Sequence, residues 1–147
     1  MKTPIRQLVV LALASAAVGA PVAPRPNILL ILSDDLNVSL GAFGHPVAQT
    51  PHLDALARRS VRFDRAYCQF PHCNPSRASM MTGLRPNTTR VTLNSDNLYQ
   101  IHPDIVTLPH HFRRNGYATA RFGKIFHLGV PAGTESRDDP KAWEVGS

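Results

Sequence analysis

The apolar run that follows Pro26 predicts the first strand of the fold. Residues 27–33 read NILLILS, with a proline before them and two aspartates after them. A short, continuous apolar run with such limits is typical of a strand buried on both faces of a parallel sheet. Asp34 and Asp35 would then lie at the carboxyl end of this strand, where open α/β sheets bind their ligands.

Patterns typical of strands and helices alternate along the rest of the chain. Residues 61–68, VRFDRAYC, alternate apolar and polar positions and predict a second strand, and residues 117–124, YATARFGK, predict a third. Proline in a first turn and glycine after an apolar run mark helix ends. These signals predict three helices: one that begins at Thr50-Pro51, one that is capped by Asn74, opens at Pro75 and ends near Gly83, and one from about Leu108 to Gly116. The alternation predicts an α/β fold.

The first 23 residues have the layout of a secretory signal peptide. Lys2 and Arg6 precede an uncharged run from Leu8 to Ala20 that ends in small residues. This run is shorter than the roughly 20 residues that a transmembrane helix needs, although an uncleaved N-terminal anchor stays an alternative. We therefore predict an exported protein without integral membrane association, periplasmic, extracellular or lysosomal depending on the host.

The length of the chain and its last residues point in different directions. A chain of 147 residues is ordinarily one domain with one core. The final stretch, DDPKAWEVGS, however, contains no evident last element or helix cap. We therefore expect a fragment, in which residues 26–147 are the N-terminal part of a larger catalytic domain that is truncated at its C-terminus.

The positive charge of the chain is mild and is spread along it. The formal net charge is +6, and Lys2 and Arg6 of the expected signal peptide account for two of these charges. A nucleic-acid-binding protein would more often show a basic stripe with interleaved aromatic residues. The charge suits an anionic substrate at least as well, and no nucleic-acid partner is predicted.

Cys68 and Cys73 are the two cysteines of the chain. A disulfide between them is possible in an exported protein, but it would close a very small loop. Their spacing differs from Cys-x-x-Cys, which argues against a redox protein. Cys73 precedes a predicted helix start, where the thiol pKa would be lowered and the thiolate could act as a nucleophile; the alternative is a buried, inert cysteine.

Arg77 would lie one helical turn after Cys73, on the same face, where its guanidinium could bind an oxyanion. The alternative is a surface arginine. Lys124 and His127, in FGKIFH, could bind an anionic group and donate a proton, respectively. Taken singly, each of these two is as well explained by a solvated side chain in a loop.

Adjacent carboxylates such as Asp34 and Asp35 repel each other and need a cation to compensate them. Two hard oxygen donors suit Ca²⁺ or Mg²⁺ better than a soft metal. The alternative is that Asp34 caps a turn or helix while Asp35 is solvated. In a doubly wound sheet, this pair, the segment from Cys73 to Arg77, and Lys124 with His127 would converge on one crevice.

Taken together, these residues resemble the sulfatase family. The run Cys73-Asn74-Pro75-Ser76-Arg77, with Thr82-Gly83 after it, resembles the family signature, Cys-x-Pro-Ser-Arg followed by Thr-Gly. The Asp34-Asp35 block and Gly123-Lys124-x-x-His127 accompany it at the right separations. The resemblance extends from about Pro26 to Gly129. Within the family, the chain is most similar to members that remove the 2-O-sulfate of iduronate in glycosaminoglycans. It departs slightly where many members have Arg directly after Thr-Gly.

This resemblance implies the alkaline-phosphatase-like fold, a sheet sandwiched by helices and incomplete in this fragment. It also implies that a formylglycine-generating enzyme oxidises Cys73 to formylglycine while the segment is unfolded. One hydroxyl of the hydrated aldehyde would attack the sulfur of a sulfate ester and release the alcohol. The other would lose its proton, restore the aldehyde and expel sulfate. A serine or a thiol has no second hydroxyl and would stay sulfated.

The family's calcium ligands correspond to Asp34, Asp35 and the residue at position 73. Arg77 and Lys124 correspond to cationic groups around the formylglycine and the ester oxygens, and His127 would hydrogen-bond a hydroxyl of the diol. Further ligands and catalytic residues would lie beyond this chain, so we expect the fragment alone to be inactive. Two other functions stay open: a phosphoesterase or phosphonate hydrolase of the same superfamily, and a truncated, non-catalytic protein that binds sulfated glycans.

Overall fold

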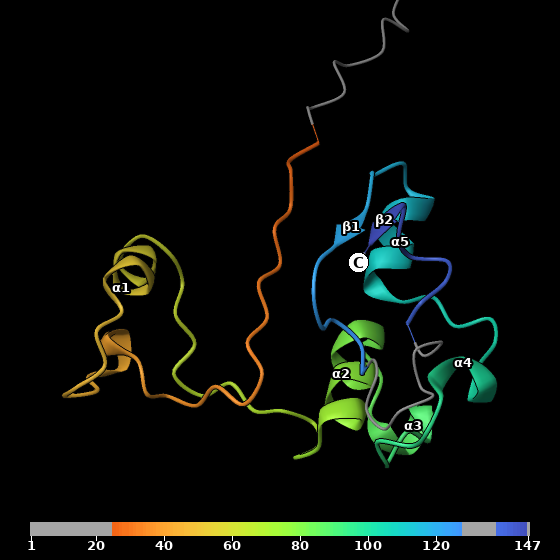
Figure 1. Cartoon of the computed structure of the whole chain (residues 1–147), viewed down its shortest axis with the longest axis horizontal. Helices are drawn as coiled ribbons and strands as arrows, with labels where there is room; N and C mark the ends of the chain where they lie inside the picture. Colours follow the sequence, from red (N-terminus) through yellow and green to blue (C-terminus); the bar gives the residue numbers. More distant parts are fainter. Residues whose placement is uncertain (1–24, 128–137, 147) are drawn as a thin grey trace, which may run out of the picture. The chain divides into compact units, whose positions relative to one another are not determined.

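The computed structural model describes residues 25–127 and 138–146. The expected signal peptide, residues 1–23, lies outside the described residues. The chain divides into two compact units, of which the first ends at Ile31 and the second begins at Leu32. The elements of the second unit, labelled in Figure 1, are η2 (Gly41–Phe43, a 3-10 helix), α1 (Pro51–Arg58), α2 (Cys73–Thr82), α3 (Pro86–Thr89), α4 (Leu98–Ile101), α5 (Leu108–Arg114), β1 (Ala120–Arg121) and β2 (Val145–Gly146).

The two strands predicted at residues 27–33 and 61–68 are absent from the described structure. Both segments lack strand pairing, and most of their apolar side chains are exposed, with Leu29 at 83% and Val61 at 80%; Leu32 is partly buried and packs against the core. The third predicted strand is reduced to β1, which pairs in parallel with β2, so that Ala120 lies opposite Val145. An apolar run favours burial, but a strand also needs a neighbour for its backbone groups. The described residues offer these two segments no neighbouring strand.

The three predicted helices are present, with small differences at their ends. α2 begins at Cys73 rather than after Asn74, and His72 is its N-cap residue. It ends at Gly83, whose φ of 71° lies in the left-handed region that glycine adopts without strain. α5 ends at Arg114, two residues before Gly116, which has a φ of 79°. Local capping signals therefore located these helices within one or two residues.

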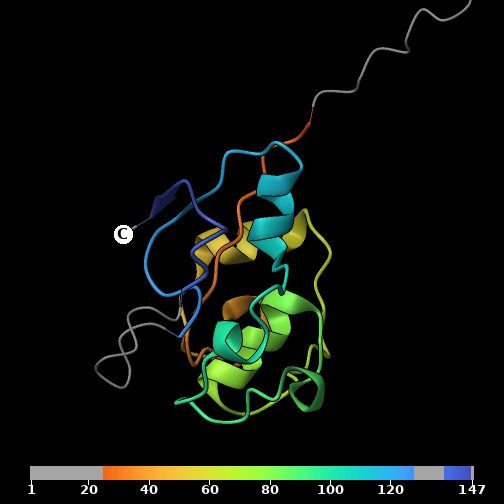
Figure 2. The ribbon, with the colours of Figure 1, turned by 90° about the vertical axis from the view of Figure 1, so that its right-hand side faces the viewer.

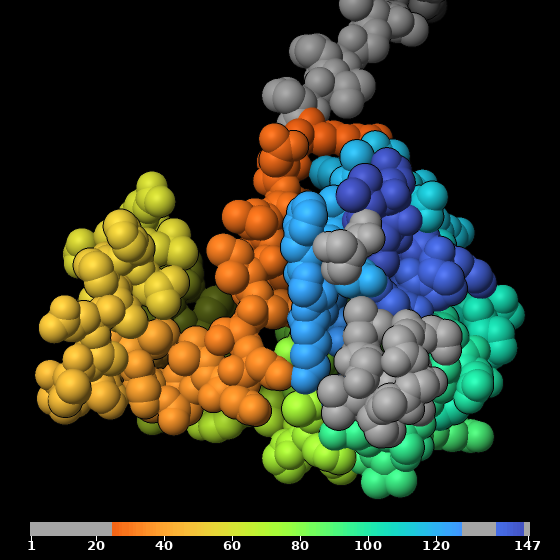
Figure 3. Space-filling model, viewed as in Figure 1, coloured from red at the N-terminus to blue at the C-terminus, as the bar shows by residue number. Residues whose placement is uncertain are grey.

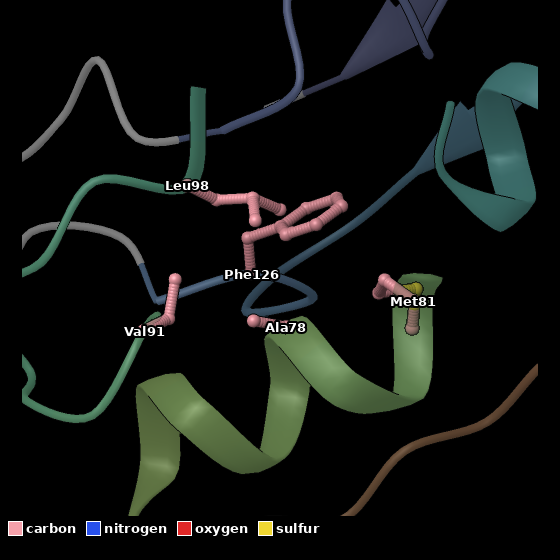
Figure 4. Close-up of a cluster of buried hydrophobic side chains, with 5 residues drawn as sticks. All are labelled: Ala78, Met81, Val91, Leu98 and Phe126. Carbon is pink, nitrogen blue, oxygen red and sulfur yellow. The ribbon is translucent and has the colours of Figure 1, made fainter. Parts of the chain in front are cut away.

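The hydrophobic core of the second unit is built around α2. Its buried members are Ala78, Met81, Val91, Leu98 and Phe126. Figure 4 shows Ala78 and Met81 on α2, with Leu98 and Phe126 next to each other. Leu98 belongs to α4 and Phe126 follows β1, so the core ties together segments from three parts of the sequence. In Figure 2 the green helices α2 and α3 lie beside each other.

Polar contacts fasten the segment 138–146 beside α5 and β1. Asp139 is buried, and its carboxylate accepts hydrogen bonds from the hydroxyl of Thr107 and from the backbone N–H of Lys141, the latter at 2.9 Å. Asp138 accepts a bond from the indole N–H of Trp143 at 3.0 Å and pairs with Arg121 of β1. These contacts hold β2 against β1, the strand that leads into the loop with Lys124.

The segment with η2 and α1 is much more exposed than the surroundings of α2. The helix α1 has no buried residue, and Leu53 and Leu56 are about half exposed. Figure 3 shows this segment in orange and yellow, with its side chains on the visible surface. Thr50 links its two elements, because its hydroxyl accepts a bond from Gly41 N–H at 2.9 Å and donates one to Asp54 at 2.8 Å. No helix in the described ranges is long and apolar enough to cross a membrane.

Candidate active site

Asp34 lies between two cationic side chains that come from distant parts of the sequence. One carboxylate oxygen accepts a hydrogen bond from the guanidinium of Arg77 at 2.8 Å. The other accepts one from the ammonium of Lys124 at 2.7 Å. Asp34 is thus the point at which the 32–35 segment, α2 and the loop after β1 meet. It does not cap a turn or helix, as one alternative from the sequence would have it.

These contacts keep Asp34 ionised over a wide pH range. The hydrogen bond from Lys124 is the largest cause, and that from Arg77 the second; together they lower the pKa of Asp34 to about 2. Both cations are bound to the charged form of the carboxyl group, so protonation would break two charge-assisted bonds. The site therefore contains an ionised carboxylate that is hydrogen-bonded to two cationic side chains.

Asp35 has an unusual backbone conformation directly beside this ionised group. Its φ is 52°, in the left-handed region that non-glycine residues adopt at a cost, aspartate less than most. The left-handed residue thus lies within the acidic pair itself, next to Cys73. One carboxylate oxygen of Asp34, one of Asp35 and the Sγ of Cys73 all lie within 4.8 Å of one another.

The chemistry of this group of atoms fits a hard divalent cation. Carboxylate oxygens are preferred ligands of Ca²⁺, which takes six to eight oxygens. Asp34 and Asp35 supply two carboxylates, and an oxygen in place of the sulfur at position 73 would match the same preference. Asp34, Asp35 and the residue at position 73 are therefore the described residues that could hold such an ion together.

Cys73 is the first residue of α2 and is partly buried. Cys68 is exposed, and both cysteines are free thiols in the structure. Three residues of the helix start are buried, namely Asn74, Pro75 and Arg77. The position of Cys73 therefore depends on how the first turn of α2 is held.

Arg77 is not a surface arginine. Its side chain is 8% exposed, and one terminal nitrogen donates to two backbone carbonyls, those of Lys124 at 2.9 Å and Ile125 at 2.8 Å. The other terminal nitrogen donates to Asp34. Three of its five N–H groups are thus used within the protein. Arg77 holds the Lys124 loop against the acidic pair, and sequence reasoning had anticipated its charge but not these bonds.

Lys124 and His127 differ in accessibility. The Lys124 side chain is 32% exposed, so a ligand can approach its ammonium from solvent. His127 is 2% exposed, which excludes a solvated loop histidine. It is linked to the site through the backbone, two residues after the Ile125 carbonyl that Arg77 binds. The structure thus brings together Asp34, Asp35, Cys73, Arg77 and Lys124, and it places His127 in the buried end of the same loop.

Asn74 is a residue whose contacts the sequence did not reveal. The sequence predicted that it caps α2, but its buried side-chain amide donates instead to Leu93 O at 2.9 Å and Asp96 O at 2.8 Å. A signal was present in TLNSD, residues 92–96, because Asn, Ser and Asp favour turns in which their side chains bond the nearby backbone. The sequence could not tell which residue these acceptors would meet.

The family of this chain follows from comparison with known proteins. A profile of the family described as Sulfatase matches residues 26–135, about three quarters of the chain. The chain belongs to the sulfatase family. It is similar to Iduronate 2-sulfatase of Mus musculus, with 42% identity over 90% of this chain and 24% of that protein. Iduronate 2-sulfatase of Homo sapiens is 40% identical over 80% of this chain and 21% of that protein. Choline-sulfatase of Rhizobium meliloti (strain 1021) is 44% identical over 71% of this chain and 20% of that protein.

The chain spans about a quarter or less of the length of these curated relatives. Membership of the family implies the alkaline-phosphatase-like α/β fold. Of its sheet, the described residues contain one parallel pair of two-residue strands. The resemblance that was drawn from the signature at Cys73 is confirmed by the family match.

Proposed function

We propose that this chain is part of an enzyme that hydrolyses sulfate esters at the site around Cys73. The observation that carries the proposal is the contact between Asp34 and two cations, Arg77 and Lys124, beside Cys73 at the start of α2. An acidic pair next to a nucleophile and a partly exposed lysine suits transfer of a sulfuryl group from an anionic ester. The carboxylates hold a cation, and the lysine binds the anion.

Asp34 and Asp35 would hold Ca²⁺ together with the residue at position 73. When bound there, calcium would orient the nucleophile and offset charge on the sulfate group. Lys124 would bind an oxygen of the ester with its exposed ammonium. Arg77 would act through its bonds to Asp34 and to the carbonyls of the Lys124 loop, which keep both groups in place. His127, at the buried end of this loop, would move a proton.

Cys73 would be the precursor of formylglycine, formed by a modifying enzyme that reads the unfolded segment. The hydrated aldehyde would supply two hydroxyls on one carbon, one to attack sulfur and one whose deprotonation releases sulfate. The partly buried Cys73 and the free state of both cysteines are compatible with such a modification. Pro75 and Ser76 would serve recognition by the modifying enzyme and shape the start of α2.

A sulfated carbohydrate is the proposed substrate class, with iduronate 2-sulfate of glycosaminoglycans as its first candidate. The support is the 42% identity to an Iduronate 2-sulfatase over 90% of this chain. The export of the protein is proposed from the charged and apolar pattern of residues 1–23. Residues 26–147 are proposed to be the N-terminal part of the catalytic domain, because Asp34, Asp35 and the residue at position 73 would give only three of the six to eight ligands that Ca²⁺ takes.

The test is hydrolysis of an aryl sulfate and an aryl phosphate by the longest protein that contains this chain, produced together with a formylglycine-generating enzyme. We expect the sulfate to be cleaved faster, a chelator to abolish the activity, and Ca²⁺ to restore it. The variant Cys73→Ala should be inactive, whereas Cys68→Ala should keep its activity. Mass spectrometry of the peptide with Cys73 should show the mass loss of the aldehyde.

Three outcomes would contradict the proposal. Faster cleavage of the phosphate would favour a phosphoesterase or phosphonate hydrolase. An unmodified Cys73 thiol with binding of sulfated glycans but no turnover would favour a non-catalytic protein. Activity that is insensitive to chelators would argue against the metal role of the acidic pair.

A further inference from the structure

Asn74, the residue directly after Cys73, fastens the first turn of α2 to a turn about 20 residues further along the chain. Its side-chain amide donates to Leu93 O at 2.9 Å and to Asp96 O at 2.8 Å. Its backbone N–H donates to the side-chain oxygen of Asn94 at 3.0 Å. Both neighbours of the amide nitrogen are carbonyl oxygens, so the orientation of the amide group follows from the contacts. Asn74 is 7% exposed, and these bonds are shielded from water.

The turn that receives Asn74 is itself closed by side-chain bonds. The carboxylate of Asp96 accepts from the backbone N–H of Thr92 at 2.7 Å and of Leu93 at 2.8 Å. The backbone N–H of Asp96 donates in turn to Leu93 O at 3.2 Å. Residues 92–96 therefore present their acceptors in a fixed arrangement, and we call them the 92–96 turn. Asn74, which donates to two of these acceptors, is therefore held in one position relative to the 92–96 turn.

The start of α2 depends on this turn because it lacks an ordinary cap. A helix leaves its first backbone N–H groups without intrahelical acceptors. His72, the N-cap residue, makes no side-chain cap bond, and Pro75 has no N–H to satisfy. Ser76 N–H bonds His72 O at 3.0 Å. The remote side chain of Asn94 thus takes the place of a cap for Asn74 N–H, one residue from Cys73.

We propose that Asn74 is a positioning residue that holds the side chain of Cys73 at the acidic pair. The proposal rests on the proposed function, since it assigns to Asn74 the task of placing the group at position 73. One backbone bond and two side-chain bonds to the 92–96 turn hold the buried residue 74 in place. Cys73 shares a peptide bond with it and is placed by the same contacts. Asn suits this position because it offers two N–H donors to two carbonyls.

Two substitutions of Asn74 can show whether it acts through its hydrogen bonds or only through its volume. Aspartate has nearly the same shape as asparagine but no donor, and it would direct an oxygen at two carbonyl oxygens. Asn74→Asp should therefore release the first turn at least as much as Asn74→Ala, although it keeps the volume. Asn94→Ala should have a weaker effect on Cys73, because it removes the acceptor for the backbone N–H but leaves the two bonds of the Asn74 amide in place.

The experiment measures how fast iodoacetamide alkylates each cysteine in the chain produced without the modifying enzyme, so that Cys73 remains a thiol. Peptide mass spectrometry follows Cys73 and Cys68 in the same sample at one pH, well below the melting temperature. We expect Asn74→Ala and Asn74→Asp to raise the alkylation rate at Cys73 about tenfold, because both variants lose the bonds that hold the first turn of α2 in place. The rate at Cys68 should stay within about twofold and serve as internal reference.

Ser79→Ala is the matched control on the same helix. Ser79 is buried in α2, and in the described part of the chain its hydroxyl has no hydrogen-bond partner. This variant should leave both rates unchanged. The proposal is overturned if Cys73 reacts no faster in the two Asn74 variants. It is overturned equally if both cysteines accelerate in parallel, which would mean general loosening, or if Asn74→Asp behaves like the unchanged protein, which would mean packing alone.

These results do not depend on catalysis, so the two proposals can fail separately. If the intact protein releases no sulfate but the Asn74 variants expose Cys73 selectively, the positioning role stands and the proposed function fails. If the protein is an active sulfatase, Asn74→Ala should lower kcat about tenfold with little change in KM, because the nucleophile and not the substrate is displaced. An active enzyme whose kcat is indifferent to Asn74→Ala and Asn74→Asp would overturn the positioning role alone.

Discussion

The helices α1 and α2 have similar lengths and similar sequence signals, yet their surroundings differ in kind. α1 carries an apolar stripe, but Leu53 and Leu56 remain about half exposed. α2 buries six of its ten residues, and three of these are the polar Asn74, Arg77 and Ser79. An amphipathic pattern is therefore neither sufficient nor necessary for burial in this chain. Burial depends on whether distant segments supply carbonyls and apolar side chains to meet the helix.

The largest expected contrast is between apolar side chains of the two helices. Met81→Ala should lower the free energy of unfolding by about 3 kcal/mol, because the buried side chain leaves a cavity in the core. Leu56→Ala, on α1, should cost less than about 1 kcal/mol, since half of the side chain is already in water. Urea denaturation of both variants measures the difference. Equal losses would show that α1 is buried in solution.

Arg77→Ala should give the second largest effect, a loss of about 2 kcal/mol. The change removes bonds to the carbonyls of Lys124 and Ile125 and leaves Asp34 with one cation instead of two. The exposed Arg58 of α1 is the matched control, and Arg58→Ala should stay within about 0.5 kcal/mol. Denaturation curves of the two variants test this pair. If Arg77→Ala costs as little as Arg58→Ala, the bonds from Arg77 to the carbonyls of Lys124 and Ile125 do not stabilise the protein.

Two glycines in left-handed conformations allow the α2 region and the η2–α1 segment to be compared by substitution of the backbone alone. Gly83 ends α2 and Gly44 ends η2, with φ values of 71° and 80°, and a Cβ at either would touch nothing within 4 Å. Alanine should therefore cost only the left-handed strain, about 1 kcal/mol, at Gly83. Thermal unfolding of Gly83→Ala should shift accordingly. Gly44→Ala should leave the melting temperature of the main transition unchanged, because we expect the η2–α1 segment to unfold on its own. If both variants lower this melting temperature equally, the two regions unfold together.

The smallest effect concerns pH. The folded pKa of Asp34, about 2, lies below its ordinary value of 3.8. A depressed carboxyl pKa contributes stability that is present above the unfolded pKa and is lost as pH falls from about 4 through about 2. Because Asp34 is nearly half exposed, solvent weakens this contribution. Carbon NMR of the Asp34 carboxyl group should find its midpoint near 2 in the unchanged chain, and a higher midpoint in Lys124→Met, which removes the largest cause. A midpoint near 4 in both would disprove the bond to Lys124.

The sequence by itself determined the features that depend on neighbours along the chain. The prolines and glycines located α1, α2 and α5, and the signature from Cys73 to Arg77 lies within one helix. The link to Asp34, Asp35 and Lys124, which are far away in the sequence, came from the resemblance to the sulfatase family, and the structure brings these residues together. The signature at Cys73 also identified the family. Such signals are local because caps, turns and helix faces are set by residues within a few positions of one another.

The tertiary structure alone decided where the long side chains form their bonds. Arg77 reaches carbonyls 47 and 48 residues further along, and Asn74 reaches acceptors 19 to 22 residues away. Nothing local encodes these partners, because a backbone carbonyl is present at every residue and only folding selects which one is near. The same reason explains the strands predicted at 27–33 and 61–68: their apolar patterns express a tendency to be buried, while pairing depends on a neighbouring strand that the described residues do not provide.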